Sequence, residues 1–273
     1  MLELKVFTSP VHQINGGAGG TFSPTTATLV FGATEALLVD TLYMPEDIDA
    51  LGDMIDGVGR RLTTIAITHG HADHYFGIDR LTGRFPDARV VATPAVAADI
   101  GRNHDDQVAT FSAWFPDIAL PGSAPQPAPE RAVTVDGHAV RLVDVDQADI
   151  APSSVVHIPV LDAIIAGDLA YNGIHQMLAL IGPQEWARWA ASVDAVAELA
   201  PRIVIAGHKD PQAADDGPRI LRSTRAYLDD FAELAKTATS ARDLVGAMQQ
   251  RYPDHGNLTT LIASAQAAMR AHR

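Results

Sequence analysis

The sequence predicts a layered sandwich of the α/β (α+β) class with a helical extension at its C-terminus. Two observations support this prediction. Short runs of aliphatic and β-branched residues come in groups before Asp210, with helical patterns between the groups, and strand patterns stop after Asp210. Grouped strands favour sheets packed in layers over a doubly wound parallel sheet. We therefore expect an α/β domain over residues 1–212 and a helical appendage over 213–273 that packs on it.

The individual elements follow from hydrophobic periodicity and from the positions of Gly and Pro. Glycines between positions 16 and 20 suggest a mobile loop, and five prolines between 114 and 130 suggest an irregular surface segment. The expected strands are 26–31, 36–39, 62–68, 89–92, 132–135, 139–145, 154–158, 163–166 and 202–206. The expected helices are 45–58, 77–82, 94–103, 183–199, 217–236, 240–251 and 257–272.

The composition narrows the class of function. The 273 residues are 47% hydrophobic and carry a formal net charge of -13, which argues against nucleic acid as the main partner. The chain has no cysteine, so disulfides and thiolate chemistry are excluded. The N-terminus lacks a basic region followed by an apolar one, and no apolar run is long enough to span a bilayer. We expect a cytoplasmic protein that binds neither nucleic acid nor membrane, and a homodimer remains open.

Four metal-ligand side chains fall within six residues, directly after the strand predicted at 62–68. The segment is His69-Gly-His71-Ala-Asp73-His74. Neutral imidazole and carboxylate are the ligands that borderline divalent metals such as Zn²⁺ prefer. The alternative is a polar turn with solvated histidines.

Three further candidate ligands stand where other strand patterns end or begin. Asp168 follows Gly167, His208 follows Gly207, and Asp149 precedes the strand at 154–158. Each residue alone is weak evidence, since an Asp after a Gly is usually a turn residue. The repeated order of apolar strand, Gly and ligand predicts that these strand ends converge on one site.

These segments resemble the metallo-β-lactamase superfamily over about residues 20 to 210. The H-x-H-x-D-H motif is the most specific element, and Gly167-Asp168, Gly207-His208 and Val39-Asp40-Thr41 support it. The resemblance implies an αββα sandwich with two metals between the sheet edges. It also implies the ligand sets: His69 and His71 for the first metal, Asp73, His74 and His208 for the second, and Asp168 as the bridge.

One position departs from the family pattern. Where the family usually supplies another His to the first metal, about ten residues before the Pro that closes the next strand, this chain has Asp149 ahead of Pro159. Asp is a competent ligand, but its charge would weaken the metal as a Lewis acid and raise the pKa of bound water. We expect two divalent cations, with Zn²⁺ favoured and Mn or Fe open because of Asp149. The alternative is that Asp149 is a turn residue and the first site is weakened or empty.

The resemblance also suggests catalytic and substrate-binding residues. Asp73 is expected to take part in proton transfer to the leaving group as well as in metal binding. Tyr171 lies three residues after Asp168, the offset at which acyl-homoserine lactonases of this superfamily carry a Tyr that hydrogen-bonds the substrate carbonyl. A Tyr at a strand end is also an ordinary packing choice. Further candidates for the substrate pocket are His175, Trp114 and Phe115, of which the last two could equally form an apolar cluster under a loop.

The expected function is metal-dependent hydrolysis of a small substrate. Two divalent ions can share a hydroxide and polarise a carbonyl oxygen, so no protein nucleophile is needed. This suits a chain without cysteine or a Gly-x-Ser-x-Gly elbow. The scissile bond would belong to a lactone, ester, thioester or related acyl compound, and a lactonase or esterase is favoured. The alternatives are a β-lactamase, a hydroxyacylglutathione-type hydrolase, an iron-dependent oxidoreductase on the same fold, and a binding module with a degenerate site.

Overall fold

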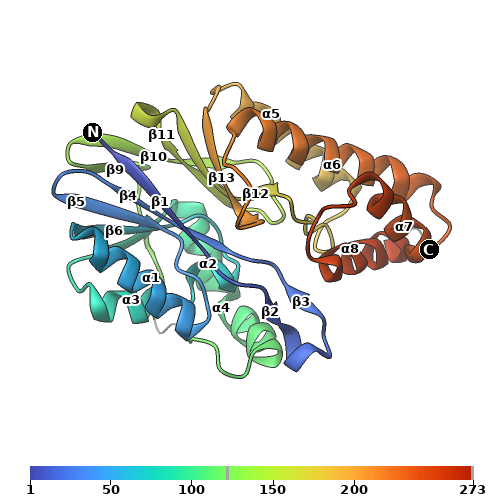
Figure 1. Ribbon diagram of the computed structural model, residues 1–273, viewed down its shortest axis with the longest axis horizontal. Coiled ribbons are helices and arrows are strands. Elements are labelled where there is room, and N and C mark those ends of the chain that lie inside the picture. Colours follow the sequence, from blue (N-terminus) through green and yellow to red (C-terminus); the bar gives the residue numbers. More distant parts are fainter. Residues whose placement is uncertain (121–122, 272–273) are drawn as a thin grey trace.

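Two β-sheets face each other and helices cover both outer faces, which makes an αββα sandwich (Figure 1). The computed structural model describes residues 1–120 and 123–271. The first sheet has the strand order β1-β4-β5-β6-β7-β8 and the second has the order β13-β12-β11-β10-β9. A short hairpin pairs β2 with β3 outside both sheets.

The first sheet changes from antiparallel to parallel at β5. Its strands β1, β4 and β5 pair antiparallel, and β5, β6, β7 and β8 pair parallel. The bounds are β1 Glu3–Thr8, β4 Thr26–Phe31, β5 Glu35–Val39, β6 Arg61–Ile67, β7 Arg89–Ala92 and β8 Gln126–Pro127. The helices α1 Pro45–Val58, α3 Ile78–Arg84 and α4 Pro94–Trp114 lie on its outer side, and the short α2 Ala72–Tyr75 lies at its end.

The second sheet is antiparallel except at β12 and β13, which pair parallel. Its strands are β9 Ala132–Val135, β10 His138–Val145, β11 Ser153–Ile158, β12 Ala163–Asn172 and β13 Ile203–Lys209. The remaining helices are α5 Pro183–Ala197, α6 Gly217–Thr237, α7 Ala241–Arg251 and α8 Leu258–Ala271. The hairpin strands are β2 His12–Gln13 and β3 Thr21–Phe22, and the short 3-10 helices are η1 Ile14–Gly17 and η2 Pro159–Leu161.

Strand β5 shows why the sandwich is stable. Successive side chains of a strand point to opposite faces. Accordingly, Leu38 packs under the outer helices, whereas Leu37 and Val39 pack between the two sheets. All three are fully buried, and each fully buried side chain of this kind contributes about 1.5–3 kcal/mol to folding. A strand buried on both faces explains the continuous apolar run in the sequence.

The C-terminal helices share a hydrophobic core with the second sheet. Helix α6 places Tyr227 and Phe231 in one cluster with Trp186 and Trp189 of α5. The Trp189 indole nitrogen donates to the Leu169 carbonyl of β12 at 2.9 Å, which ties this layer to the sheet. The helical extension therefore packs on the sandwich, and a domain boundary at residue 212 stays a prediction.

The predicted elements are found, and α2, β8 and the two 3-10 helices are additional to them. Further differences concern longer segments. Helix α4 continues to Trp114 because its second half is amphipathic, although acidic residues interrupt its apolar pattern. Strand β12 continues to Asn172 because it is buried along its whole length, including its polar residues. The N-terminal strand β1 and the β2–β3 hairpin, which occupies the region expected to be a glycine-rich loop, were not expected. Residues 121–122 of the predicted irregular segment and residue 272 of the last predicted helix lie outside the described residues.

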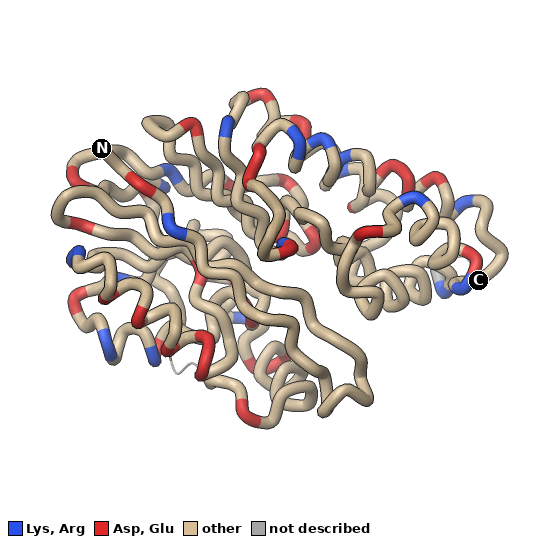
Figure 2. Tube along the Cα trace, viewed as in Figure 1, with Lys and Arg blue, Asp and Glu red and all other residues tan. Residues whose placement is uncertain are grey.

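Charged residues of both signs alternate along the outer helices (Figure 2). Some form pairs between neighbouring helices at the surface, such as Arg84 of α3 with Asp53 of α1 at 2.7 Å and Arg225 of α6 with Asp194 of α5 at 3.1 Å. Exposed pairs of this kind contribute little to stability. Within the described part of the chain, no helix combines the length and the apolar character that crossing a membrane requires.

Candidate metal centre

The first four candidate ligands leave the carboxyl end of β6 together. The strand ends at Ile67, His69 and His71 follow in the loop, and Asp73 and His74 lie in the short helix α2. His69, Asp73 and His74 are at most 2% exposed. A buried strand that ends inside the sandwich thus delivers polar side chains to an interior site.

The second sheet supplies the other three ligands from the opposite side. Asp149 lies in the loop between β10 and β11, Asp168 lies within β12, and His208 lies within β13. Gly167 precedes Asp168 and Gly207 precedes His208, and neither position has room for a side chain. A side chain at Gly207 would collide with Asp168 Oδ1, and one at Gly167, where φ is +49°, would lie 2.7 Å from Thr68 Oγ1.

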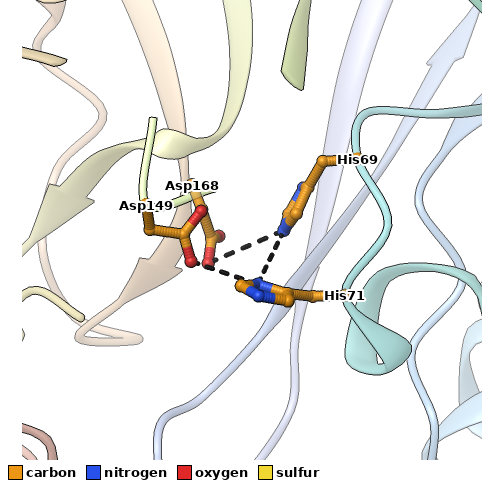
Figure 3. A group of neighbouring side chains, drawn as sticks. All are labelled: His69, His71, Asp149 and Asp168. Carbon is orange, nitrogen blue, oxygen red and sulfur yellow. Dashed lines mark hydrogen bonds and ion pairs between the residues drawn. The ribbon is translucent and has the colours of Figure 1, made fainter. Parts of the chain in front are cut away.

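One group of ligand atoms combines two histidines and two aspartates (Figure 3). His71 Nδ1 lies 3.1 Å from Asp149 Oδ2 and 3.2 Å from His69 Nε2, and His69 Nε2 lies 3.8 Å from Asp168 Oδ2. In this group all four ligand atoms lie within 4.8 Å of one another, close enough to surround a single ion.

A second group lies beside the first and consists of Asp73, His74 and His208. Asp73 Oδ2 lies 3.3 Å from His74 Nε2 and 3.5 Å from His208 Nε2. Asp168 reaches this group too, because its two oxygens lie 3.2 Å from His74 Nε2 and 3.2 Å from His208 Nε2. Asp168 therefore contacts both groups, as a bridging ligand must.

The residues present fit divalent metal ions. His74 Nε2 and Asp168 Oδ1 are buried and have no hydrogen-bond partner among the described residues, although they lie 3.2 Å apart. Buried polar atoms are rarely left without a partner. Two such atoms that lie close together therefore indicate a binding place for a cation. The donor set of imidazole and carboxylate suits Zn²⁺, Mn²⁺ or Fe²⁺.

Hydrogen bonds on the far side of each ring orient the histidines for this role. His69 Nδ1 contacts Thr68 Oγ1 at 3.0 Å, and His208 Nδ1 contacts the Pro24 carbonyl at 3.1 Å. Such contacts fix which ring nitrogen is free to bind a metal. In these histidines Nε2 faces the site, whereas His71 presents Nδ1.

Asp40 holds His74 in the same way and also braces the loop. Its Oδ2 lies 2.8 Å from His74 Nδ1 and accepts a bond from Thr68 Oγ1, while its Oδ1 accepts from the Thr68 backbone N–H at 2.9 Å. Asp40 has φ +62°, an uncommon conformation for a residue with a side chain. Strain of this kind is typical of residues whose position matters to a site.

Charge inside the site shifts the pKa of its members when no metal is bound. Burial alone lowers the pKa of His71, but the carboxylates of Asp149, Asp73 and Asp168 together outweigh burial and raise it to about 9. Burial raises the pKa of Asp149 to about 6, and His71 opposes that shift. His71 therefore carries a proton at neutral pH, and a metal ion would have to replace it.

A pocket with a volume of about 180 Å³ opens onto these ligands. One wall is a face of α4, where Gln107, Thr110, Phe111 and Trp114 follow one another at helical spacing. The β2–β3 hairpin forms a second wall. The segment after β12 and the start of α8 form the rest of the pocket lining. The residues from these segments are Phe22, Ser23, Met177, Leu180 and Thr260.

The C-terminal helix holds the hairpin wall in place. Thr21 donates its backbone N–H to Thr259 Oγ1 at 3.0 Å. The Asn257 amide bridges the same strand, because its nitrogen donates to the Thr21 carbonyl at 2.9 Å and its oxygen accepts from the Ser23 N–H at 3.1 Å. A segment far from the motif in sequence therefore shapes the pocket.

The structure brings together all seven predicted ligands but only part of the predicted pocket. Tyr171 and Trp114 line the pocket, and the Tyr171 hydroxyl donates to Asp168 Oδ2 at 3.0 Å. The placement of Phe115 and His175 on the pocket wall was wrong. Phe115 packs in the core against Tyr43, and His175 is buried with Nδ1 at 2.9 Å from the Tyr227 hydroxyl.

The sequence analysis missed Gln107, Thr110 and Phe111 of α4 and both other walls. Helix α4 was expected to end at residue 103, although Gln107, Phe111 and Trp114 already follow the spacing of one helical face. That spacing was the available signal. The sequence of the hairpin and of the start of α8 contains no comparable signal, since only folding brings Ser23 and Thr260 into the same pocket.

Comparison with known proteins agrees with this geometry. A model of the metallo-beta-lactamase superfamily matches residues 20–208. No curated protein matches the sequence. Solved structures match the fold at low identity, among them a metallo-beta-lactamase family protein from Thermus thermophilus with a TM-score of 0.67 and 18% identity, covering 98% of this chain and 92% of that one.

Two further structures extend this likeness. A beta-lactamase domain protein from Burkholderia ambifaria has a TM-score of 0.67 and 17% identity, covering 98% of this chain and 85% of that one. The metallo-beta-lactamase FIM-1 from Pseudomonas aeruginosa, in its mono-zinc form, has a TM-score of 0.59 and 17% identity, covering 84% of this chain and 92% of that one. At such identity these structures show the fold alone. Since the family model spans more than half of the chain, and its range contains all seven candidate ligands, the chain belongs to the metallo-beta-lactamase superfamily.

Proposed function

We propose that this protein is a hydrolase of lactones or esters that uses two divalent metal ions, with Zn²⁺ favoured. The observation that carries the proposal is the convergence of two ligand groups, sharing Asp168, on a pocket whose other walls are apolar or neutral. His69, His71 and Asp149 would hold one ion, Asp73, His74 and His208 the other, and Asp168 both. When bound, such a pair activates water and polarises a carbonyl.

The residues around the ligands then have defined tasks. Hydrolysis forms a bond between the acyl carbon and the water oxygen, breaks the bond to the leaving oxygen, and moves a proton to that oxygen. Asp73 lies in the pocket wall, and Thr25 Oγ1 donates to its Oδ2 at 3.0 Å. We assign Asp73 the transfer of that proton.

Tyr171 is the candidate for orienting the substrate carbonyl. Its ring stands in the pocket wall and its hydroxyl lies next to Asp168. Burial raises the pKa of Tyr171 well above its ordinary value, with Asp168 adding to the shift, so the hydroxyl keeps its proton. That proton is donated to Asp168 here, and it would become available to a substrate carbonyl once Asp168 binds metal. Tyr171→Phe should therefore lower kcat/KM while leaving metal content unchanged.

The test is metal analysis combined with turnover on lactones, aryl esters, thioesters, phosphoesters and β-lactams. We expect hydrolysis of lactones and aryl esters that is lost on chelation and restored by Zn²⁺. A preference for phosphoesters or β-lactams would contradict the substrate class. An iron-dependent absorption spectrum together with oxygen consumption would contradict hydrolysis itself and favour a redox enzyme on this fold.

A further inference from the structure

Gln107 lies on the pocket face of α4, and its side chain has a fixed direction. Its Oε1 accepts a hydrogen bond from the backbone N–H of Ala72 at 3.0 Å. Ala72 stands between His71 and Asp73, so this bond holds the ligand loop. Because the Ala72 N–H requires an acceptor, the amide oxygen and not the amide nitrogen must face the loop.

The amide nitrogen of Gln107 is consequently free for another task. Among the described residues it has no hydrogen-bond partner, and the half-buried side chain lines the pocket together with His71 and Asp73. An amide nitrogen offers two hydrogens and no lone pair for accepting a bond. Gln107 therefore presents a donor to any molecule that fills the pocket.

The surroundings of this donor suit an uncharged acceptor. Thr110 lies one turn further along the same helix face, and Phe111 and Trp114 follow it. The described lining residues other than the candidate ligands are hydroxyl, amide, thioether or apolar side chains. Outside the candidate ligands, none of the described lining residues is a Lys or Arg that could pair with a substrate carboxylate.

We propose that Gln107 is a substrate-binding residue, which donates an amide hydrogen bond to an uncharged oxygen of the acyl substrate and favours substrates without a carboxylate. This inference rests on the proposed function and adds to it a residue and a substrate class. It assigns Gln107 two roles on its two sides: the oxygen positions the ligand loop and the nitrogen binds substrate.

Two substitutions separate these roles. In Gln107→Glu the carboxylate can still accept from the Ala72 N–H but cannot donate to a substrate. In Gln107→Met both bonds are lost. Gln249→Glu makes the same chemical change on the exposed surface of α7 and serves as the control. The probes are δ-decalactone for turnover and its lactam analogue for binding, both with metal-loaded protein.

For Gln107→Glu we expect KM for the lactone and Kd for the lactam to rise about tenfold, which is the usual effect of one lost hydrogen bond. Its kcat should stay within about threefold, and its metal content should equal that of the wild type and of Gln249→Glu. Gln107→Met should show the same binding defect and also bind metal more weakly. The wild type should hydrolyse 4-nitrophenyl butyrate at least about tenfold better, in kcat/KM, than the corresponding hemisuccinate ester.

Unchanged KM and Kd in Gln107→Glu, together with metal loss in Gln107→Met, would overturn the substrate-binding role and leave only a structural one. A wild-type preference for the hemisuccinate would overturn the assigned substrate class. If the wild type hydrolyses no acyl substrate but binds the lactam in a Gln107-dependent way, the proposed function fails and the binding role stands. If the wild type neither hydrolyses acyl substrates nor binds the lactam, both proposals fail.

Discussion

Asp149 places a buried carboxylate in the group of ligand atoms around His69 and His71. It lies 3.1 Å from His71, and its side chain is only 1% exposed. Together with Asp73 and Asp168 it brings the site to three carboxylates among seven candidate ligands. A pair of divalent ions held there would have more of its charge neutralised than with an imidazole at this position.

Replacing Asp149 tests its place in the site. We expect Asp149→Ala to reduce metal content from two ions per chain towards one, because the first group loses a ligand, whereas Asp149→His should keep both. Metal analysis after dialysis measures this directly. Asp146→Ala removes a nearby exposed carboxylate that pairs with Arg188 and should have no effect. Equal occupancy in Asp149→Ala and wild type would show that Asp149 is not a ligand.

The candidate ligands could be singled out in the sequence because each stands where a strand pattern ends or begins. His69 to His74 follow β6 directly, and the glycines before Asp168 and His208 mark close approach of the chain. The pocket residues were harder to find. Phe115 and Trp114 are neighbours in sequence with the same apolar character, and only packing decides that Trp114 lines the pocket while Phe115 enters the core.

At the scale of elements, the parallel pair β12–β13 sets the geometry of the second sheet's ligands. Tyr171 and His208 are paired across it, and the register shifts around Gly167 bring Asp168 towards both metal groups. The full length of β12 could not be predicted, since its polar residues break the apolar pattern. They are nevertheless buried, because they belong to the site.

A side chain at Gly207 should damage the site through this strand pair. The Cβ of Gly207→Ala would collide with Asp168 Oδ1 and with the backbone of Gly167, so Asp168 must move. We expect loss of at least one metal ion per chain and a lower melting temperature. The matched change Gly246→Ala in α7 meets open space and should be neutral or stabilise by up to about 1 kcal/mol. Full metal content in Gly207→Ala would refute this account of the glycine.

At the scale of the whole molecule, the sandwich assembles one site from two sheets and a C-terminal helical layer. The layered fold was predictable because strand and helix patterns are clear in the core, where β5 is apolar on both faces. The contribution of α8 to the pocket was not predictable. It depends on bonds such as Thr21 to Thr259, which join the two ends of the chain.

The helical layer should make stability depend on pH. Burial lowers the pKa of His175 to about 4, and His255 adds to the shift. Between the ordinary value of about 6.5 and about 4, the unfolded chain binds a proton that the folded chain does not, so the free energy of unfolding falls as pH falls. Denaturant titrations from pH 7 to 4 should show a smaller decrease in His175→Gln than in wild type. Identical pH profiles would contradict the buried, neutral state of His175.

The most direct test of the proposed two-metal site is the number of metal ions bound per chain, measured on purified protein by elemental analysis before and after chelation. With excess Zn²⁺ the wild type should bind two ions per chain. Asp168→Asn, which removes the charge of the shared ligand while keeping its shape, should bind at most one. A wild type that binds no divalent ion, or an Asp168→Asn variant that binds two as tightly as the wild type, would contradict a centre built around Asp168.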